Sequence, residues 1–133
     1  MSAEISNNKS VAMEYFASLA RNDVAGMSNC MTDDATWWIV PGTKFSGLHS
    51  KASFLGNIPA LFEGTTGGLV LDFYDVTAQD NRVAIVAKGN LKFKDGRIYA
   101  SNYNFLLTFR EGKIVNGKEF LDALHVNEIF GVE

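Results

Sequence analysis

The chain has 133 residues, a formal charge of −3 at pH 7 and 47% hydrophobic residues. These values are those of one folded domain, residues 1–133, with a core over about residues 8–126. No block of basic residues occurs, which removes the usual electrostatic basis of nucleic-acid binding. The single cysteine, Cys30, excludes an internal disulfide framework. The two histidines of the chain are scattered and do not make a zinc site with Cys30.

The N-terminal residues 1–9 are polar and contain no apolar signal core. No apolar run in the chain approaches the length that crosses a membrane. We therefore expect a soluble cytoplasmic protein with neither nucleic-acid nor membrane partners.

The N-terminal part of the chain is predicted to be helical. Val11, Tyr15 and Leu19 recur at four-residue steps, a spacing that predicts an amphipathic helix over residues 8–21. Asp23 is a suitable N-cap for a second short helix that ends at Met31.

The next stretch contains one strand and one helix. Residues 32–34 predict a turn, and the aromatic and β-branched residues 35–40 predict a strand that Pro41-Gly42 ends. A loop follows, and Ser50 is a plausible cap for a third helix over residues 50–63.

From residue 69 the periodicity of the sequence changes to two. The Gly-rich residues 64–68 are the loosest stretch, which we interpret as a mobile connection able to act as a lid. Strands are expected over residues 69–77, 82–94, 97–110 and 113–121, with a short closing helix after them. This order predicts an α+β protein in which three helices cover one face of a curved antiparallel sheet.

The strand at residues 97–110 is apolar on both faces. One face carries Tyr99, Tyr103 and Phe105, and the other carries Asn102, Asn104 and Leu106. Parity alone does not decide which of the two faces lines an interior. Because a sheet covered by helices on one side normally has a wet second side, the apolar second face predicts a homodimer packed through the sheet.

Several sequence segments together resemble a known family. They are Tyr15–Asp23, Asp33–Trp37, Pro41-Gly42, Ser46-Gly47, Lys51, and Gly112–Ile114 leading to Lys118–Asp122. The chain resembles the NTF2-like superfamily, and within it the SnoaL-like, ketosteroid-isomerase-related branch, from about residue 8 to residue 126. The resemblance implies a cone-shaped fold, which hosts many reactions and also non-enzymes.

The catalytic residues of related enzymes transfer only in part. The resemblance implies that Tyr15 matches the tyrosine with which ketosteroid isomerases hydrogen-bond an oxyanion, whereas their proton-shuttling aspartate falls at Ile39. Of the five residues that limonene epoxide hydrolases use, only the final aspartate is kept, as Asp122. In SnoaL-type cyclases an aspartate near the last strand is the base and a histidine assists it. Asp122 and His125 resemble that pair.

These residues suggest a site, and each also has a structural interpretation. Asp122 is a candidate general base if it faces an apolar cavity, and otherwise it caps the following helix. Tyr15 would donate to an oxyanion, and His125 would assist Asp122 or lie at the helix surface. The expected pocket walls are Trp37, Trp38, Phe54, Phe62, Tyr103 and Phe105. The roles of His49 and Lys88 are left open, because a loop histidine and a strand lysine are usually exposed.

We therefore expect a small-molecule-binding protein, interpreted as a cofactor-independent isomerase, cyclase or lyase without a metal. Its ligand would be a small apolar or mixed-polarity molecule. The alternative is a non-catalytic module of the same fold that binds a ligand or a protein. An ionisable residue of perturbed pKa in a pocket favours the enzyme, and an interior filled by its own side chains favours the alternative.

Overall fold

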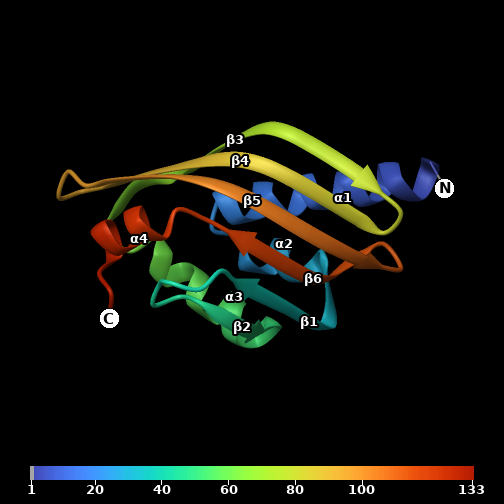
Figure 1. The fold of residues 1–133 in the computed structure, drawn as a ribbon, viewed down its shortest axis with the longest axis horizontal. Coiled ribbons are helices and arrows are strands. Elements are labelled where there is room, and N and C mark those ends of the chain that lie inside the picture. Colours follow the sequence, from blue (N-terminus) through green and yellow to red (C-terminus); the bar gives the residue numbers. More distant parts are fainter. Residues whose placement is uncertain (1) are drawn as a thin grey trace.

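The computed structural model describes residues 2–133 and contains four helices and six strands (Figure 1). In chain order these are α1 (Ser2–Ala20), α2 (Val24–Asn29), β1 (Met31–Ile39), β2 (Gly47–Ser50), α3 (Lys51–Leu61), β3 (Thr65–Gln79), β4 (Arg82–Phe93), β5 (Ile98–Arg110), β6 (Lys113–Phe120) and α4 (Ala123–Phe130). The α+β class predicted from the sequence is confirmed, with four helices in place of three.

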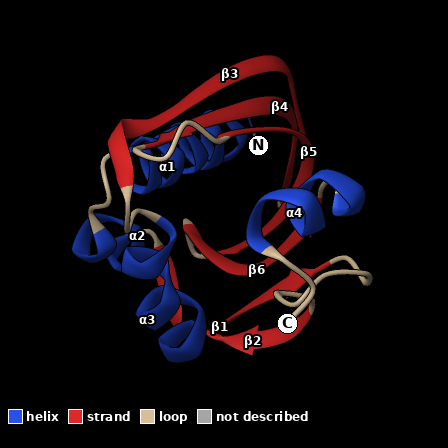
Figure 2. Ribbon diagram, turned by 90° about the vertical axis from the view of Figure 1, so that its left-hand side faces the viewer, coloured by secondary structure: helices blue, strands red, loops and turns tan. Residues whose placement is uncertain are grey.

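The six strands form one curved sheet in the order β2-β1-β6-β5-β4-β3. The neighbours β1 and β6 run parallel, and every other neighbouring pair is antiparallel, so the sheet is mixed. Figure 2 shows the sheet curving from β3 round to β1, with α1, α2 and α3 closing the other side and α4 at the rim. The inner face of the sheet and the helices therefore enclose a common interior.

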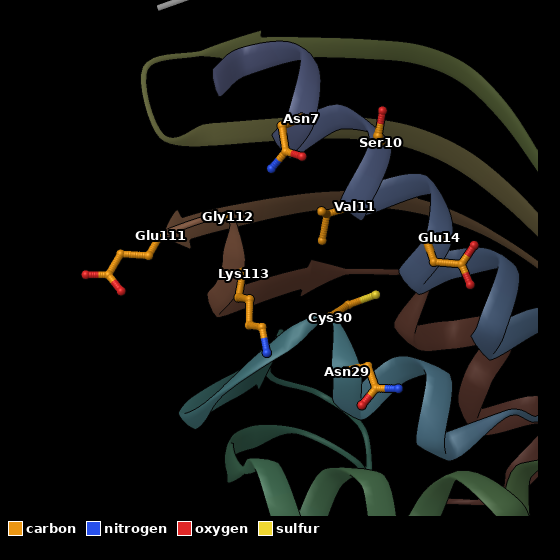
Figure 3. A pocket seen from close by; sticks show the side chains of 9 residues that line it. All are labelled: Asn7, Ser10, Val11, Glu14, Asn29, Cys30, Glu111, Gly112 and Lys113. Carbon is orange, nitrogen blue, oxygen red and sulfur yellow. The ribbon is translucent and has the colours of Figure 1, made fainter. Parts of the chain in front are cut away.

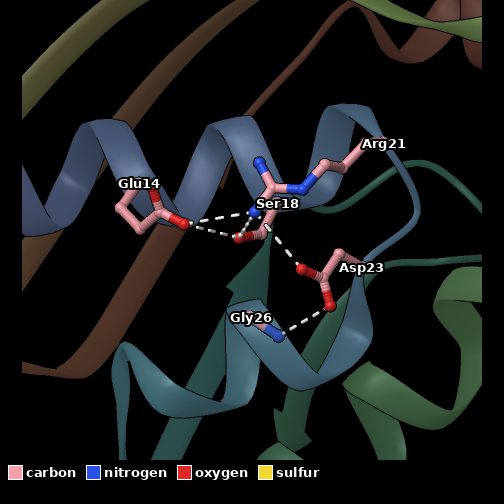
Figure 4. A network of polar contacts seen from close by, with 5 residues as sticks. All are labelled: Glu14, Ser18, Arg21, Asp23 and Gly26. Atoms are coloured by element: carbon pink, nitrogen blue, oxygen red, sulfur yellow. Dashed lines mark hydrogen bonds and ion pairs between the residues drawn. The ribbon is translucent and has the colours of Figure 1, made fainter.

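The helices begin where the sequence provides caps. Asp23 precedes α2 and its Oδ1 accepts a hydrogen bond from the backbone N–H of Gly26 at 2.9 Å. Ser50 caps α3, where its Oγ accepts a hydrogen bond from the backbone N–H of Ser53. Arg21 then bridges Glu14 and Asp23, each at 3.2 Å, and so links the end of α1 to the start of α2 (Figure 4).

The strands alternate between an inner and an outer face, as their period of two requires. On β5 the residues Tyr99, Ser101, Phe105, Leu107 and Phe109 are buried, whereas Asn102 and Asn104 are exposed. The aromatic face of this strand is therefore the inner one, which sequence parity left undecided. Trp37 and Trp38 point to opposite faces of β1, as expected.

Three segments differ from the sequence-based expectation. Residues 32–34 form part of β1 rather than a turn, because β1 lies beside β6 and Arg110 binds Asp34 at 2.7 Å. The expected loop after residue 40 contains β2, which pairs with β1. Most of the Gly-rich stretch belongs to β3, where Thr65 and Thr66 pair with β4. Cross-strand pairing overrides local turn propensity at residues 47–50 and 65–66, whereas residues 32–34 lie in an irregular part of β1 between the paired Met31 and Thr36.

The buried side chains form two connected clusters. The larger one, which includes Tyr15, Phe16, Trp37 and Phe105, fills the space between the helices and the sheet. The second one lies under α4 and consists of Leu69, Leu91, Phe93, Tyr99 and Val126. Tyr103 and Leu121 are partly buried and pack against both clusters, so they lie at the junction.

Candidate functional site

An acidic side chain, Glu119, points into the interior from β6. Its Oε1 accepts a hydrogen bond of 2.8 Å from Nε1 of Trp37 on β1. The two strands run parallel and place Gly117 opposite Trp37. A Cβ atom at Gly117 would lie 2.1 Å from the indole ring, so the absence of a side chain there lets the ring lie against β6. The indole nitrogen thereby reaches the carboxyl group two residues further along.

Burial gives Glu119 an unusual acidity. Desolvation raises the pKa of its carboxyl group to about 7, and the hydrogen bond from Trp37 offsets this effect only in part. The side chain nevertheless stays half-buried rather than fully buried. A carboxyl group that exchanges its proton near neutral pH is suited to general acid–base chemistry.

The hydroxyl group of Tyr15 lies buried in the same interior. Its ring stacks on Trp37, with 5.3 Å between the centroids. Within residues 2–133 its hydroxyl oxygen has no hydrogen-bond partner. Burial raises the pKa of Tyr15 well above its ordinary value, and the charge of Glu119 raises it further. This hydroxyl is therefore a neutral donor, and buried polar atoms without a partner are rare in proteins.

Two more tyrosines bring their hydroxyl groups together on β5. The hydroxyl oxygens of Tyr99 and Tyr103 are 2.5 Å apart, and the ring of Tyr103 stacks on Phe105. Burial is the main reason why the pKa of Tyr99 rises to about 12 and that of Tyr103 rises well above its ordinary value. Glu119 contributes to the raised pKa of both, so its charge acts on all three tyrosines.

Together these residues provide one titratable carboxyl group and three neutral hydroxyl groups among aromatic walls. Phe54 stacks on Trp37 with 5.0 Å between the ring centroids. The ring centroids of Phe16 and Phe105 are 4.6 Å apart, and Phe105 also lies beside Trp37. Such a set can remove a proton from a bound molecule and hydrogen-bond the negative oxygen that develops. We call Glu119, Tyr15, Tyr99 and Tyr103 the interior polar cluster.

The structure places Asp122 outside this cluster. Asp122 is exposed and is the N-cap of α4, where its Oδ1 accepts from the backbone N–H of His125 at 3.2 Å. The expectation that its carboxylate faces the apolar interior is not met, and the capping alternative describes the observed contact. A catalytic role for Asp122 stays a prediction without geometric support.

His125 is close to the interior but does not contact Asp122 through its ring. Its ring stacks on Tyr99 with an interplanar angle of 5°, and its Nε2 accepts from the N–H of Ala100 at 2.9 Å. Asp122 and His125 are thus adjacent through the backbone of a helix turn rather than as a proton relay.

Five of the six residues expected to line a pocket are part of the core or pack against it, and their role as pocket walls stays a prediction. Trp37, Phe54, Phe62, Tyr103 and Phe105 belong to the interior or pack against it. Trp38 is a correction, because it lies on the outer face and packs against Phe120 at 5.3 Å. Lys88 alternates with the buried Ala87 and Gly89, so it too faces outward. On β2, Nε2 of His49 lies 2.7 Å from the carbonyl oxygen of Phe45.

Sequence reasoning missed Glu119 and the hydroxyl pair of Tyr99 and Tyr103. A signal for Glu119 existed, because it alternates with the outward-facing Lys118 and Phe120 at the end of β6. The pattern gave no indication of the indole N–H that holds its carboxyl group, because Trp37 lies 82 positions away.

A groove lies near the β5–β6 turn, at the end of the molecule away from α4 (Figures 1 and 3). It is open, measures about 400 Å3, and lies between α1, the end of α2 and the β5–β6 turn. Its lining residues are Asn7, Ser10, Val11, Glu14, Asn29, Cys30, Glu111, Gly112 and Lys113. None of the predicted site residues takes part in it.

Two further properties concern only the described residues 2–133. No three or more His, Cys, Asp or Glu side chains among them gather in a way that could hold a metal ion. No helix in this part of the chain is long and apolar enough to cross a membrane.

Comparison with known families agrees with this architecture. The family model of the SnoaL-like domain matches residues 12–117. The chain is a member of the SnoaL-like family. No curated protein matches this SnoaL-like chain.

Solved structures resemble this SnoaL-like protein in fold at low sequence identity. A SnoaL-like polyketide cyclase described as putative, from Jannaschia sp. CCS1, has a TM-score of 0.79 at 15% identity over 96% of this chain and 94% of its own. AclR, called a putative hydroxylase, from Streptomyces galilaeus also has a TM-score of 0.79, at 16% identity over 96% and 97%. PrhC from Penicillium brasilianum has a TM-score of 0.84 at 10% identity, over 95% of this chain and 87% of its own. These likenesses establish the fold, and NTF2-like proteins are among the matches.

Proposed function

We propose that this SnoaL-like protein is a cofactor-independent enzyme that transfers a proton on a small, largely apolar molecule carrying a carbonyl group, with Glu119 as the general base. One observation carries the proposal: a carboxyl group whose pKa is raised to about 7 shares an interior with three neutral tyrosine hydroxyls. Ionisable groups perturbed by burial beside specific partners are enriched at functional sites. The base in this proposal is therefore Glu119 rather than Asp122.

The proposed step is the removal of a proton from carbon beside the carbonyl group. The carboxylate of Glu119 takes that proton, and the electron pair of the broken C–H bond moves toward the carbonyl oxygen. The hydroxyl of Tyr15, which has no partner among the described residues, donates to this oxyanion. Returning the proton to another carbon gives an isomerisation. Attack of the carbanion on a second carbonyl gives a cyclisation, and expulsion of a leaving group gives an elimination.

The rival is a non-catalytic module that binds a ligand or a protein. Its support is the tight filling of the interior, where Tyr15, Trp37 and Phe105 are at most 3% exposed. The half-buried state of Glu119 and Tyr103 favours the enzyme, because neither residue is fully closed off from solvent. The two functions differ in whether the carboxyl group of Glu119 does chemistry on the bound molecule.

Deuterium exchange into a cyclic monoketone such as cyclohexanone, followed by NMR in D2O near pH 7, tests the proposal. We expect the protein to accelerate exchange at the carbons beside the carbonyl group, the variant Glu119→Gln to lose this activity, and Asp122→Asn to keep it. Loss of activity in Asp122→Asn with activity retained in Glu119→Gln would restore Asp122 as the base. Binding of the ketone without any accelerated exchange would favour the non-catalytic rival.

A homodimer packed through the outer face of the sheet is part of the same proposal. Support comes from Val86 and Phe120, which are 39% and 43% exposed there, with Trp38 beside Phe120. Sedimentation at micromolar concentration is expected to give twice the mass of one chain, and Val86→Lys is expected to give monomers. A monomeric wild-type protein would contradict it. The cytoplasmic location stays a prediction from the sequence.

A further inference from the structure

The helix α4 docks on a part of β5 that the sheet leaves open. The pairing of β5 with β6 ends at Asn104 and Phe120, so residues 98–103 have no strand on that side. The chain turns into α4 instead, and Nε2 of His125 accepts the backbone N–H of Ala100. The N–H of Asp122 donates to Oγ of Ser101 at 3.3 Å. The ring of His125 thus takes the place of a neighbouring strand as the partner of the Ala100 N–H, and Asp122 adds a contact to the side chain of Ser101.

The same helix covers one end of the interior. Val126 is 1% exposed and packs in the cluster under α4 with Tyr99. The ring of Tyr99 contacts His125, with 5.5 Å between the centroids, while its hydroxyl contacts that of Tyr103. Tyr99 is therefore the member of the interior polar cluster that contacts α4, and moving α4 away would uncover it.

The far end of α4 is held by two cations through backbone carbonyls. Lys44 donates to the carbonyl oxygen of Phe130 at 2.6 Å, and Arg97 donates to that of Ile129. Cations at the C-terminal end of a helix also interact favourably with its dipole. Neither of these two contacts involves an imidazole, whereas the contact with the N–H of Ala100 does.

We propose that α4 is a movable cover over the Tyr99 and Tyr103 end of the interior, and that the neutral ring of His125 latches it shut. This inference rests on the proposed function for its purpose, which is to admit a ligand to Glu119. An acceptor nitrogen must carry no proton. A protonated ring presents N–H groups at both nitrogens, so Nε2–H would face the N–H of Ala100 and the contact would become repulsive.

Several charged and titratable groups surround His125. On α4, Nδ1 of His125 lies 3.6 Å from Oε2 of Glu128, and this contact is an ion pair only when the ring carries a second proton. Asp122 sits at the start of the same helix and binds the backbone N–H of His125. From β5 the ring faces Tyr99, whose raised pKa keeps it neutral over this range. Arg97 and Lys44 act on the carbonyls at the other end.

Hydrogen exchange on the full chain at pH 8 and pH 5.5, corrected for the intrinsic pH dependence of exchange, tests the latch. We expect the amides of Ala100 and of α4 to lose roughly tenfold in protection at pH 5.5, since one buried hydrogen bond is lost. The variant His125→Gln keeps a side-chain acceptor that does not titrate, and we expect its protection to be equal at both pH values. The matched control His49→Gln removes the other histidine and should respond as the wild type does.

Equal protection of α4 in the wild type at both pH values would overturn the latch, as would a pH response that persists in His125→Gln. If that variant does not fold, nitrogen chemical shifts of the wild-type imidazole decide instead. An unprotonated Nε2 at pH 8 is expected, and a proton on Nε2 in the neutral ring would overturn the proposal. Because neither readout uses a substrate, failure of the latch and failure of proton transfer by Glu119 are seen separately.

Discussion

Nε1 of Trp37 donates a hydrogen bond to Oε1 of Glu119 at 2.8 Å, across 82 positions of the chain. The bond connects the two parallel strands β1 and β6 inside the cone. It fixes the carboxyl group of Glu119 in the interior but does not remove the cost of ionising it there.

The first prediction concerns stability and pH. The pKa of Glu119 is raised from 4.5 to about 7 in the folded state, so the folded protein holds this proton more tightly than the unfolded chain. The stabilisation is complete below about pH 4.5 and is lost as the pH rises through about 7. At about 1.36 kcal/mol per pKa unit, ionisation costs up to about 3 kcal/mol of folding free energy. Glu119→Gln avoids this cost.

Urea unfolding at pH 5 and pH 8 measures the effect. We expect Glu119→Gln to exceed the wild type in free energy of unfolding at pH 8 and to approach it at pH 5. Other titrating groups act equally in both proteins, so the difference isolates Glu119. A difference that is the same at both pH values would contradict the raised pKa.

The second prediction compares two tyrosines. Tyr15→Phe removes a buried hydroxyl without a partner and should leave stability unchanged or raise it by about 1 kcal/mol. Tyr103→Phe removes the hydrogen bond to Tyr99 and should lower stability by about 1 kcal/mol. Thermal unfolding measures both. In the ketone exchange assay, Tyr15→Phe should lose on the order of a hundredfold in rate. Unchanged exchange would remove Tyr15 from the site.

The third prediction concerns the glycines under the aromatic rings. A Cβ atom at Gly117 would lie 2.1 Å from Trp37, and one at Gly89 would lie 2.9 Å from Tyr103. Gly117→Ala should therefore cost about 3 kcal/mol and Gly89→Ala less, measured by chemical unfolding. Gly56→Ala is the control, because nothing lies within 4 Å of its Cβ in α3, and it should be neutral or stabilising. A neutral Gly117→Ala would mean that the indole lies elsewhere.

The fourth prediction concerns Asp122 as a cap. Asp122→Ala removes the acceptor for the N–H of His125 and should lower the free energy of unfolding by about 1 kcal/mol. Asp122→Asn keeps an acceptor oxygen and should retain most of the stability that the cap contributes. Circular dichroism during heating measures the difference. Equal stability of Asp122→Ala and the wild type would show that the cap contributes nothing.

Local patterns were sufficient for most of the fold. The helix stripe around Tyr15, the cap at Ser50 and the alternation along β5 each depend on neighbours within a few residues, so the sequence contains their signal directly. The segments at residues 32–34 and 64–68 were predicted wrongly because distant strands hold the chain extended there: β6 pairs with Met31 and Thr36 on either side of the first segment, and β4 pairs with Thr65 and Thr66 in the second. A single sequence does not display those partners.

The site was less accessible to the same reasoning. Asp122 stands beside a helix start, and an acid there is equally typical of a cap and of a catalytic group. Glu119 acquires its character only when β6 is placed beside β1, because that register brings Trp37 to its carboxyl group. The difference between the two acids is therefore a property of the sheet rather than of either local sequence.

The position of β6 between β1 and β5 also bears on how the protein is made. A nascent chain that has emerged only as far as Glu111 can pair β2 with β1, and β3 with β4 and β5, but nothing joins these two pieces into one sheet. The strand that joins them is translated after the other five, and pairing across such a distance is slow. Until then β1 and β5 expose open edges toward each other, so the late synthesis of β6 is the period in which this protein depends most on protection from aggregation.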